Sequence, residues 1–331
     1  MAKMPLLSII VTSYTMGRLS DIYELLDSIR AQTYTNVETI LVAERSRELY
    51  DRIKAYTQEK SIPNPKVIFN DGELGLSAAR NLGVKHAEGD IIAFIDDDVL
   101  PFSDWAEEIV KTYQDSSVIG ATGPILPLWK DEPMDWFPSQ FDWVLSCSSF
   151  SGITEKRAVR NVWGTNMSFR REAFDLSGPF LTHLGAKGGG GGLGKQDFAG
   201  EETEFSIRLR RITGKSILYN PNIRVYSKVY KYRATPTFIA KRAYSEGYTK
   251  AMFNRTYRDN ANSEKLLSVE YQLLGRIFTE LFPDIFKRFF TNPIIAWRKF
   301  SVTIIALSFV ALGYFSYSLQ SILGGIRSRS S

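Results

Sequence analysis

The sequence predicts an α/β fold in which a mixed, mainly parallel sheet is flanked by helices, followed by amphipathic C-terminal helices and a hydrophobic tail helix. Three observations predict it. Apolar runs of strand length alternate with helix-like stretches from residue 6 to residue 98. Residues 227–300 carry 14 Lys and Arg against six Asp and Glu, and no charged residue occurs between Lys299 and Arg327. The chain has 331 residues, 44% of them hydrophobic, which is enough for a sizeable core.

The first hundred residues contain the elements of a parallel sheet. Apolar runs predict strands at 6–14, 37–44, 65–70 and 90–98, and the stretches between them predict helices at 19–32, after residue 44 and at 76–87. Strands and helices that alternate at this spacing favour parallel pairing through crossover helices. Later, VIGATGPILPLW and RNVWGTNMSF predict further strands, a helix follows around residues 202–211, and the chain is helical and amphipathic from about residue 236.

Polar side chains end the four predicted strands. They are Ser13, Glu44, Asn70 and Asp96–Asp98. In parallel sheets, ligands bind outside the carboxyl ends of the strands. We therefore expect these side chains to line one crevice.

Composition excludes several classes of site. The single cysteine, Cys147, rules out an intramolecular disulfide and multi-cysteine metal sites, and two histidines rule out a histidine-rich site. A metal would be held mostly by carboxylates, as Mg²⁺ or Mn²⁺ is. Residues 1–226 carry 25 Lys and Arg against 30 Asp and Glu. An acidic body with a basic C-terminal third argues against nucleic acid as a partner and favours an anionic membrane surface.

Asp96-Asp97-Asp98 is the strongest local signal. Three adjacent carboxylates repel one another unless a cation lies among them. A strand points alternate residues the same way, so we expect Asp96 and Asp98 to share one face. A divalent ion held there would complete its coordination with substrate phosphates. The alternative is an acidic turn that leads into the next helix.

A second signal is Glu201-Glu202, which follows a glycine run and precedes an amphipathic helix. A carboxylate at this junction would serve as a general base for an acceptor hydroxyl. Acidic residues are also common in the first turn of a helix because of the helix dipole. The run Gly189–Gly194 is not a phosphate-binding loop, since Gln196 stands where Ser or Thr is required; it predicts either a lid or a plain surface loop.

The uncharged C-terminal run is long enough to cross a membrane. It includes SVTIIALSFVALGYFSYSLQSILGG, whose serines and tyrosines also suit a helix lying in the interface. Basic residues gather before this run, and two follow it. The positive-inside rule therefore predicts a cytoplasmic body at the cell membrane.

Taken in order, these pieces resemble the family 2 glycosyltransferases, inverting enzymes of the Rossmann-like GT-A fold. The resemblance runs from about residue 6 to residue 248 and is carried by LLSIIVTSY, NVETILVAERS, LGLSAARNLGVKHAEGDIIAFIDDDVLP, WGTNMSFRREAF, GEETEFSIRLRRITG and YNPNIRVYSKV. GPILPLW, DWFP and KVYKYRATPTFIAKRAYSEGYTK look most similar to archaeal membrane-associated transferases that extend sugars on dolichyl phosphate.

The resemblance implies a role for each matching residue. Glu202 takes the position of the general base, and Asp98 would coordinate Mg²⁺ or Mn²⁺. The implied nucleotide-sugar contacts are Thr12, Tyr14, Glu44, Arg80, Asn81, Asp96 and Asp97. The implied acceptor and sugar pocket comprises Trp163, Gly164, Asn166 and Glu201. Three positions depart from the family pattern: Ala43–Ser46 replaces Asp-Asp-Gly-Ser, Glu202 replaces an Asp, and Ser227 replaces a His near the metal.

We therefore expect three parts. Residues 1–235 would form the catalytic domain, with a nucleotide-sugar half at about 1–115 and an acceptor half at about 116–235. Residues 236–300 would form basic amphipathic helices at the membrane interface, and 301–325 a transmembrane or interfacial helix.

The leading hypothesis is an inverting, metal-dependent transferase. It would move a sugar from a UDP-sugar donor to a polyprenyl- or dolichyl-phosphate-linked acceptor, for protein N-glycosylation or a surface glycan. Two alternatives stay open: a transferase acting on polysaccharide or directly on polyprenyl phosphate, and a catalytically silent, membrane-bound partner of another transferase, which the altered Ala43–Ser46 turn and Ser227 motivate.

Overall fold

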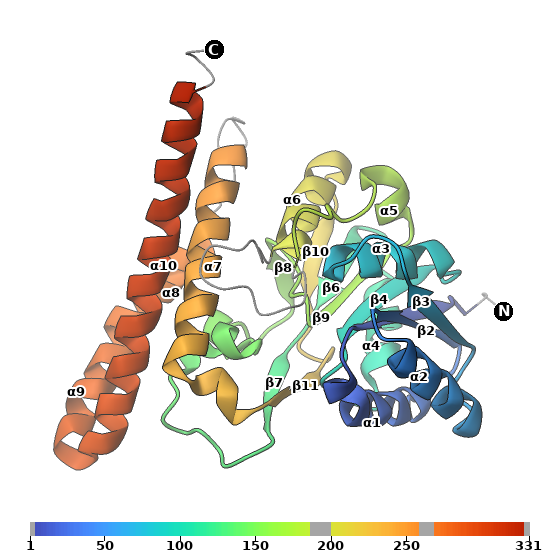
Figure 1. Cartoon of the computed structure of the whole chain (residues 1–331), viewed down its shortest axis with the longest axis horizontal. Coiled ribbons are helices and arrows are strands. Elements are labelled where there is room, and N and C mark those ends of the chain that lie inside the picture. Colours follow the sequence, from blue (N-terminus) through green and yellow to red (C-terminus); the bar gives the residue numbers. More distant parts are fainter. Residues whose placement is uncertain (1–3, 186–199, 258–267, 328–331) are drawn as a thin grey trace. The chain divides into compact units, whose positions relative to one another are not determined.

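The computed structural model describes residues 4–185, 200–257 and 268–327. The glycine run predicted to be a lid or a surface loop lies outside these residues. The chain divides into two compact units (Figure 1). Unit 1 comprises residues 1–128, 154–190 and 200–228, and unit 2 comprises residues 129–153, 191–199 and 229–331.

Eleven strands are found in the described residues: β1 Leu7–Ser13, β2 Val37–Glu44, β3 Pro65–Asn70, β4 Ile91–Asp96, β5 Val99–Pro101, β6 Val118–Thr122, β7 Ile125–Trp129, β8 Arg157–Val159, β9 Asn166–Arg170, β10 Ser216–Tyr219 and β11 Val225–Val229. The helices of unit 1 are α1 Leu19–Arg30, α2 Arg47–Glu59, α3 Leu76–His86, α4 Trp105–Thr112, α5 Glu172–Ser177 and α6 Glu201–Thr213, with a 3₁₀ turn, η1, at Met16–Arg18.

The main sheet has the order β3-β2-β1-β4-β9-β6-β10-β8. Strands β1 to β4 pair in parallel, which confirms the predicted mainly parallel sheet. Strand β9 runs antiparallel to both of its neighbours, β4 and β6. A smaller sheet has the order β5-β11-β7. The registers Thr12↔Asp96 and Glu44↔Asn70 place the ends of the four N-terminal strands at the same edge.

Both faces of the main sheet are covered by helices (Figure 1). One face packs against α1, α2 and α4, where Ile22, Ile53 and Trp105 are buried. The other face packs against α3, α5 and α6, where Ala79 and Phe205 are buried. Because both faces of the sheet are buried, successive side chains of these strands are mostly apolar, and each strand is a nearly continuous hydrophobic run in the sequence.

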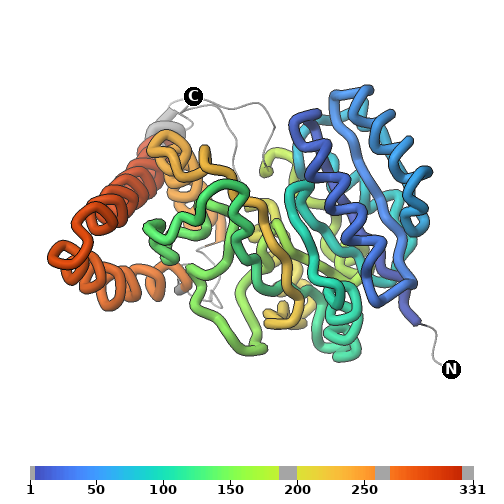
Figure 2. The backbone as a smooth tube through the Cα atoms, turned by 90° about the horizontal axis from the view of Figure 1, so that it is seen from below, coloured from blue at the N-terminus to red at the C-terminus, as the bar shows by residue number. Residues whose placement is uncertain are grey.

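Unit 2 is helical in its described residues. Its 3₁₀ turns are η2 Ser139–Leu145, η3 Ser149–Ser151 and η4 Lys231–Ala234, and its helices are α7 Pro236–Tyr257, α8 Ser268–Arg276, the π-helical turn η5 Ile277–Leu281, α9 Phe282–Thr291 and α10 Pro293–Arg327. Figure 2 shows the sharp turn of the chain between α9 and α10. Residues of 129–153 pack with these helices in one core, in which Phe141 and Leu145 meet Ile239 and Leu281.

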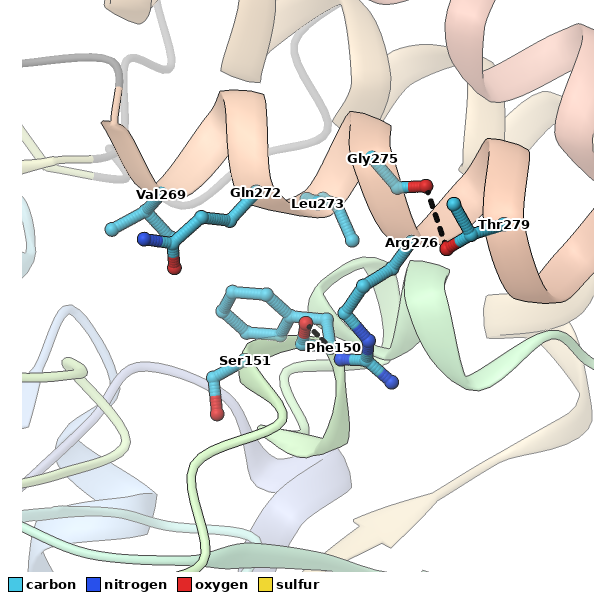
Figure 3. Close-up of a pocket in the computed structure, with 8 residues that line it drawn as sticks. All are labelled: Phe150, Ser151, Val269, Gln272, Leu273, Gly275, Arg276 and Thr279. Atoms are coloured by element: carbon cyan, nitrogen blue, oxygen red, sulfur yellow. Dashed lines mark hydrogen bonds between the residues drawn. The ribbon is translucent and has the colours of Figure 1, made fainter.

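A pocket of about 430 Å³ opens within unit 2, between η3 and the helix that runs through α8 into η5 (Figure 3). Phe150, Val269 and Leu273 give it apolar walls. Arg276 donates to the carbonyl of Phe150 at 3.0 Å and pairs with Glu280. The cation of this pocket is therefore engaged within the protein.

Helix α10 contains, among the described residues, one stretch long and apolar enough to cross a membrane, Pro293–Ile322. Only 22% of its apolar window is buried inside the protein. It is therefore not an ordinary core helix.

Candidate active site

Strand β4 ends at Asp96, and Asp97 and Asp98 form a turn before β5. The expectation that Asp96 and Asp98 share a strand face is therefore wrong, because the backbone leaves the extended conformation between them. The Ser13 hydroxyl donates to Asp97 at 2.5 Å. Arg18 pairs with Asp98 at 3.2 Å. Arg18 also lies 4.0 Å from Asp97, so it bridges Asp97 and Asp98, whereas Asp96 pairs with Arg80.

Burial dominates the titration of two of these aspartates. It raises the pKa of Asp96, against the opposing effect of the Arg80 guanidinium. Burial, reinforced by the neighbouring Asp98 carboxylate, raises the pKa of Asp97 to about 7. The turn therefore carries less negative charge near neutral pH than its three carboxylates suggest.

Arg80 links three separate segments of unit 1. Its guanidinium, which is 3% exposed, donates to Glu201 at 2.6 Å and to Asp96 at 3.1 Å. It also donates to the carbonyl of Gly164 at 3.0 Å. We call these four residues the Arg80 cluster. Since Glu201 begins α6 and Asp96 ends β4, one buried cation fixes the start of a helix against the end of a strand.

Glu202 lies beside the Arg80 cluster. A Cβ atom at Gly164 would lie 3.8 Å from the carboxyl carbon of Glu202 and 3.7 Å from the Arg80 guanidinium. Thr203 donates to the Glu202 carboxylate at 3.2 Å. Because residue 164 has no side chain, the space between the carboxylate and the guanidinium stays open. A hydroxyl placed there would lie within reach of a base.

The remaining predicted nucleotide contacts end β1 and β2 or follow them. Thr12 is level with Asp96 in the sheet, and Tyr14, just after β1, is 49% exposed. Glu44 is buried at the end of β2, where it accepts from the backbone NH of Gly75 at 2.7 Å. Gly75 has a φ of 119°, which favours glycine, and precedes α3. Glu44 thus holds the loop before the helix that carries Arg80.

Two predicted site asparagines are engaged with the backbone. The Asn81 amide both donates to and accepts from the backbone of Phe180, at 2.8 and 2.9 Å. Asn166 is 1% exposed, accepts from the Trp105 indole at 2.9 Å and donates to the carbonyl of Ile223 at 2.8 Å. With both ends of their amides used, these side chains hold the fold together, and in the described part of the chain they make no hydrogen bond to the Arg80 cluster.

The two middle residues of the Trp163–Asn166 turn contact side chains of the Arg80 cluster. The backbone NH of Asn166 donates to the carbonyl of Trp163 at 2.9 Å, which closes the turn. The Trp163 ring meets Tyr219 edge-on at 5.5 Å. Inside this turn lie Gly164, with its carbonyl on Arg80, and Thr165, whose hydroxyl interacts with Asp96.

Sequence reasoning missed a buried charge network next to the aspartates. Lys228 is fully buried and pairs with Asp21 at 2.9 Å and with Glu24 at 2.9 Å. Arg18 pairs with Asp21 at 3.1 Å as well as with Asp98. The one available signal was the Arg18–Asp21 spacing at the start of a helix, which is typical of an ordinary surface ion pair.

The donor set fits a hard divalent ion that relies on its substrate. The described residues contain no group of three or more His, Cys, Asp or Glu side chains placed to hold a metal. Asp98 offers one carboxylate, and the buried Ser227 hydroxyl, on the strand that pairs with β5, has no hydrogen-bond partner in the described structure. Mg²⁺ and Mn²⁺ sites of this kind take one or two protein carboxylates, substrate phosphates and water.

The fold and sequence match known proteins. Residues 8–177 match the model for glycosyl transferase family 2. The chain is 30% identical over 251 residues to glucosyl-dolichyl phosphate glucuronosyltransferase of Haloferax volcanii, covering 76% of this chain and 78% of that protein. It is 25% identical over 232 residues to the succinoglycan biosynthesis protein ExoM of Rhizobium meliloti, covering 68% and 70%.

Among solved structures, a mannosyltransferase of Pyrobaculum calidifontis is similar in fold. Its TM-score is 0.59 at 18% identity, over 99% of this chain and 81% of that one. A helix-flanked, mainly parallel sheet with the Arg80 cluster at its carboxyl edge agrees with these matches. The chain belongs to glycosyl transferase family 2 and is a glycosyltransferase of the GT-A fold.

Proposed function

We propose that this enzyme is an inverting transferase that moves a sugar from a UDP-sugar to a polyprenyl- or dolichyl-phosphate-linked acceptor at the cytoplasmic face of the membrane. The observation that carries the proposal is the position of Glu202 next to the Arg80 cluster, across the open space at Gly164. A base, a buried cation and the aspartate turn thus lie on one sheet edge.

Donor binding falls to residues at the ends of β1, β2 and β4. Thr12, Tyr14 and Glu44 would contact the nucleotide, Asp96 would bind the ribose, and Asp97 would add a further contact to the nucleotide sugar. Asp98 would hold Mg²⁺ or Mn²⁺. When bound, such an ion supplies charge stabilisation to the leaving diphosphate. The mannosyltransferase of P. calidifontis was solved with GDP-Man and Mn²⁺, which supports a divalent ion here.

Transfer needs one proton acceptor and one oriented hydroxyl. Glu202 would take the proton of the acceptor hydroxyl as its oxygen forms a bond to the anomeric carbon. The bond from that carbon to the UDP oxygen breaks, and the configuration at carbon inverts. Arg80, held by Glu201, keeps Asp96 and the Gly164 carbonyl in place around the donor.

Two observations support a lipid-linked acceptor. The H. volcanii relative is named for transfer to glucosyl-dolichyl phosphate. Unit 2 adds an apolar helix of membrane-spanning length and a basic composition over 227–300. We place the enzyme in N-glycosylation or surface glycan assembly. ExoM favours polysaccharide synthesis as the second candidate.

The test is Mn²⁺-dependent UDP release from a panel of UDP-sugars, with and without a polyprenyl-lipid extract. We expect lipid-stimulated release from one donor. Glu202→Gln should bind UDP normally and lose turnover, and Asp98→Ala should lose Mn²⁺-dependent UDP binding. Normal turnover in either variant contradicts its assigned role. UDP binding without release from any donor or acceptor would favour a silent partner.

A further inference from the structure

Helices α7 and α10 pack backbone against backbone. A Cβ atom at Gly247 would lie 2.0 Å from the carbonyl oxygen of Val310, and one at Gly313 would lie 2.0 Å from that of Tyr244. Contacts this close are available to glycine alone, as in helix crossings inside membranes. Figures 1 and 2 show the two helices side by side. They form one structural element.

Polar side chains join the same two helices on the C-terminal side of the glycines. Tyr248 donates to Gln320 at 2.9 Å, and Asn254 donates to Tyr314 at 2.9 Å. These bonds span the C-terminal half of the Pro293–Ile322 stretch. Separating α10 from α7 would leave these groups unpaired.

Helix α7 carries charges at the level where α10 would cross the bilayer centre. Val310 lies near the middle of the membrane-length stretch, and its partner Gly247 directly follows Glu246. Glu246 pairs with Lys250 at 3.2 Å, and Lys250 also pairs with Glu270 at 2.7 Å. If α10 crossed the membrane with α7 attached, these charges would lie at hydrocarbon depth, which is costly.

Helix α10 presents one apolar face outward. Exposed side chains recur at helical spacing along it: Ile294, Trp297, Ile304, Leu312, Phe315, Leu319 and Ile322. Val302, Ala306 and Gly313 lie on the opposite, buried side. With its opposite face packed against α7, α10 can turn this apolar stripe toward the lipids while it lies in the interface.

The neighbouring η5 and α9 extend this surface. Phe278, Phe286 and Phe290 are 65%, 67% and 78% exposed. Exposed Lys287 lies among them along the chain, and exposed Arg298 follows in α10. Bulky aromatics beside cations match the headgroup region of an anionic bilayer, where rings enter the acyl boundary and cations meet lipid phosphates.

We propose that α10 does not cross the membrane: the α7–α10 pair lies in the interface of an anionic bilayer, with the outward stripe of α10 and the aromatics of α9 buried among the lipids. Both ends of the chain then stay on one side of the membrane. The inference rests on the membrane location in the proposed function and replaces the spanning alternative with a monotopic one.

The test counts labels on single chains. A variant with Cys147→Ser, Glu59→Cys and Ser330→Cys is reconstituted into phosphatidylglycerol-containing vesicles and treated with a membrane-impermeant maleimide. Adducts per chain are then counted by intact mass. A monotopic chain carries two adducts or none, whatever its orientation. A chain with a spanning α10 carries one, and that result overturns the proposal.

Vesicle sedimentation tests the surface itself. Phe286→Ser/Phe290→Ser/Trp297→Ser should lower affinity for anionic vesicles about tenfold or more. Leu176→Ser/Ile212→Ser, which alters similarly exposed side chains of unit 1, should leave it unchanged. Equal losses in both variants, or no sedimentation of the wild type, would overturn the proposal. UDP release is assayed separately, so one adduct per chain in an active enzyme refutes the topology alone.

Discussion

The buried ion pair between Lys228 and Asp21 supports a quantitative prediction. Lys228 is completely buried, and the Asp21 side chain is 2% exposed. Lys228→Met keeps the apolar stem and removes the charge. Breaking a buried pair from one side costs about 3–5 kcal/mol, because the remaining charge loses its compensation. Arg18 still pairs with Asp21, and the Glu24 side chain is 48% exposed, so we expect the lower end, about 3 kcal/mol.

The paired substitution separates electrostatics from packing. Lys228→Met/Asp21→Asn removes both charges and should recover about half or more of the loss, a coupling energy of about 1.5 kcal/mol or more. Lys111→Met is the matched control. The Lys111 side chain is 51% exposed and pairs with Glu107 and Glu108, so its loss should cost under about 0.5 kcal/mol.

Urea unfolding of five proteins gives these free energies: the wild type, Lys228→Met, Asp21→Asn, the double variant and Lys111→Met. If Lys228→Met costs no more than Lys111→Met, or if the double-mutant coupling lies below about 0.5 kcal/mol, the pair is not the buried electrostatic contact that the structure describes.

Three further predictions concern single positions. Burial raises the pKa of Asp142 to about 6, so its protonated form is favoured in the folded state. The free energy of unfolding should therefore fall as pH rises from about 4 to 6 and then level off. At pH 8, Asp142→Asn should be more stable than the wild type by up to about 3 kcal/mol in urea unfolding. Gly313→Ala, whose Cβ would meet the Tyr244 carbonyl, should lower the melting temperature, whereas Gly275→Ala, with nothing within 4 Å, should preserve or raise it. Gly164→Ala should fold and bind UDP but lose turnover, since the new methyl enters the space beside the proposed base.

Each of these predictions has a contradicting result. Parallel pH–stability curves for wild type and Asp142→Asn would show that burial of Asp142 does not govern its titration. Equal melting temperatures for the two glycine variants would show that the helix backbones do not touch as described. Full turnover by Gly164→Ala would place the acceptor hydroxyl elsewhere.

The parallel half of the sheet was predictable because its information is local. Each of its strands is a short apolar run followed by a helical pattern, and each ends in a polar residue. These polar strand ends also predicted correctly which edge of the sheet carries the site. The reversal at β9 was not predictable, because its partners β4 and β6 are chosen by tertiary packing and not by any pattern within Asn166–Arg170.

The sequence predicted which residues form the site better than it predicted the contacts that those residues make. Asp96, Arg80 and Glu201 do come together, although Arg80 and Glu201 lie 121 positions apart. The turn after Asp96 and the engagement of Asn166 with Trp105 depend on the folded surroundings. The sequence did not indicate that Lys228 is buried, because a lysine in a strand is expected to be exposed to solvent unless a buried partner is known.

The core of unit 2 has a consequence for producing this enzyme in soluble form. Residues 129–153 lie between two stretches of unit 1 in the chain, yet Phe137 and Phe141 share their core with Val302 and Ala306 of α10. Removing the tail from residue 301 would therefore strip apolar cover from a segment that stays behind. A shortened chain would aggregate through its own uncovered middle, so a workable soluble version must also replace residues 129–153.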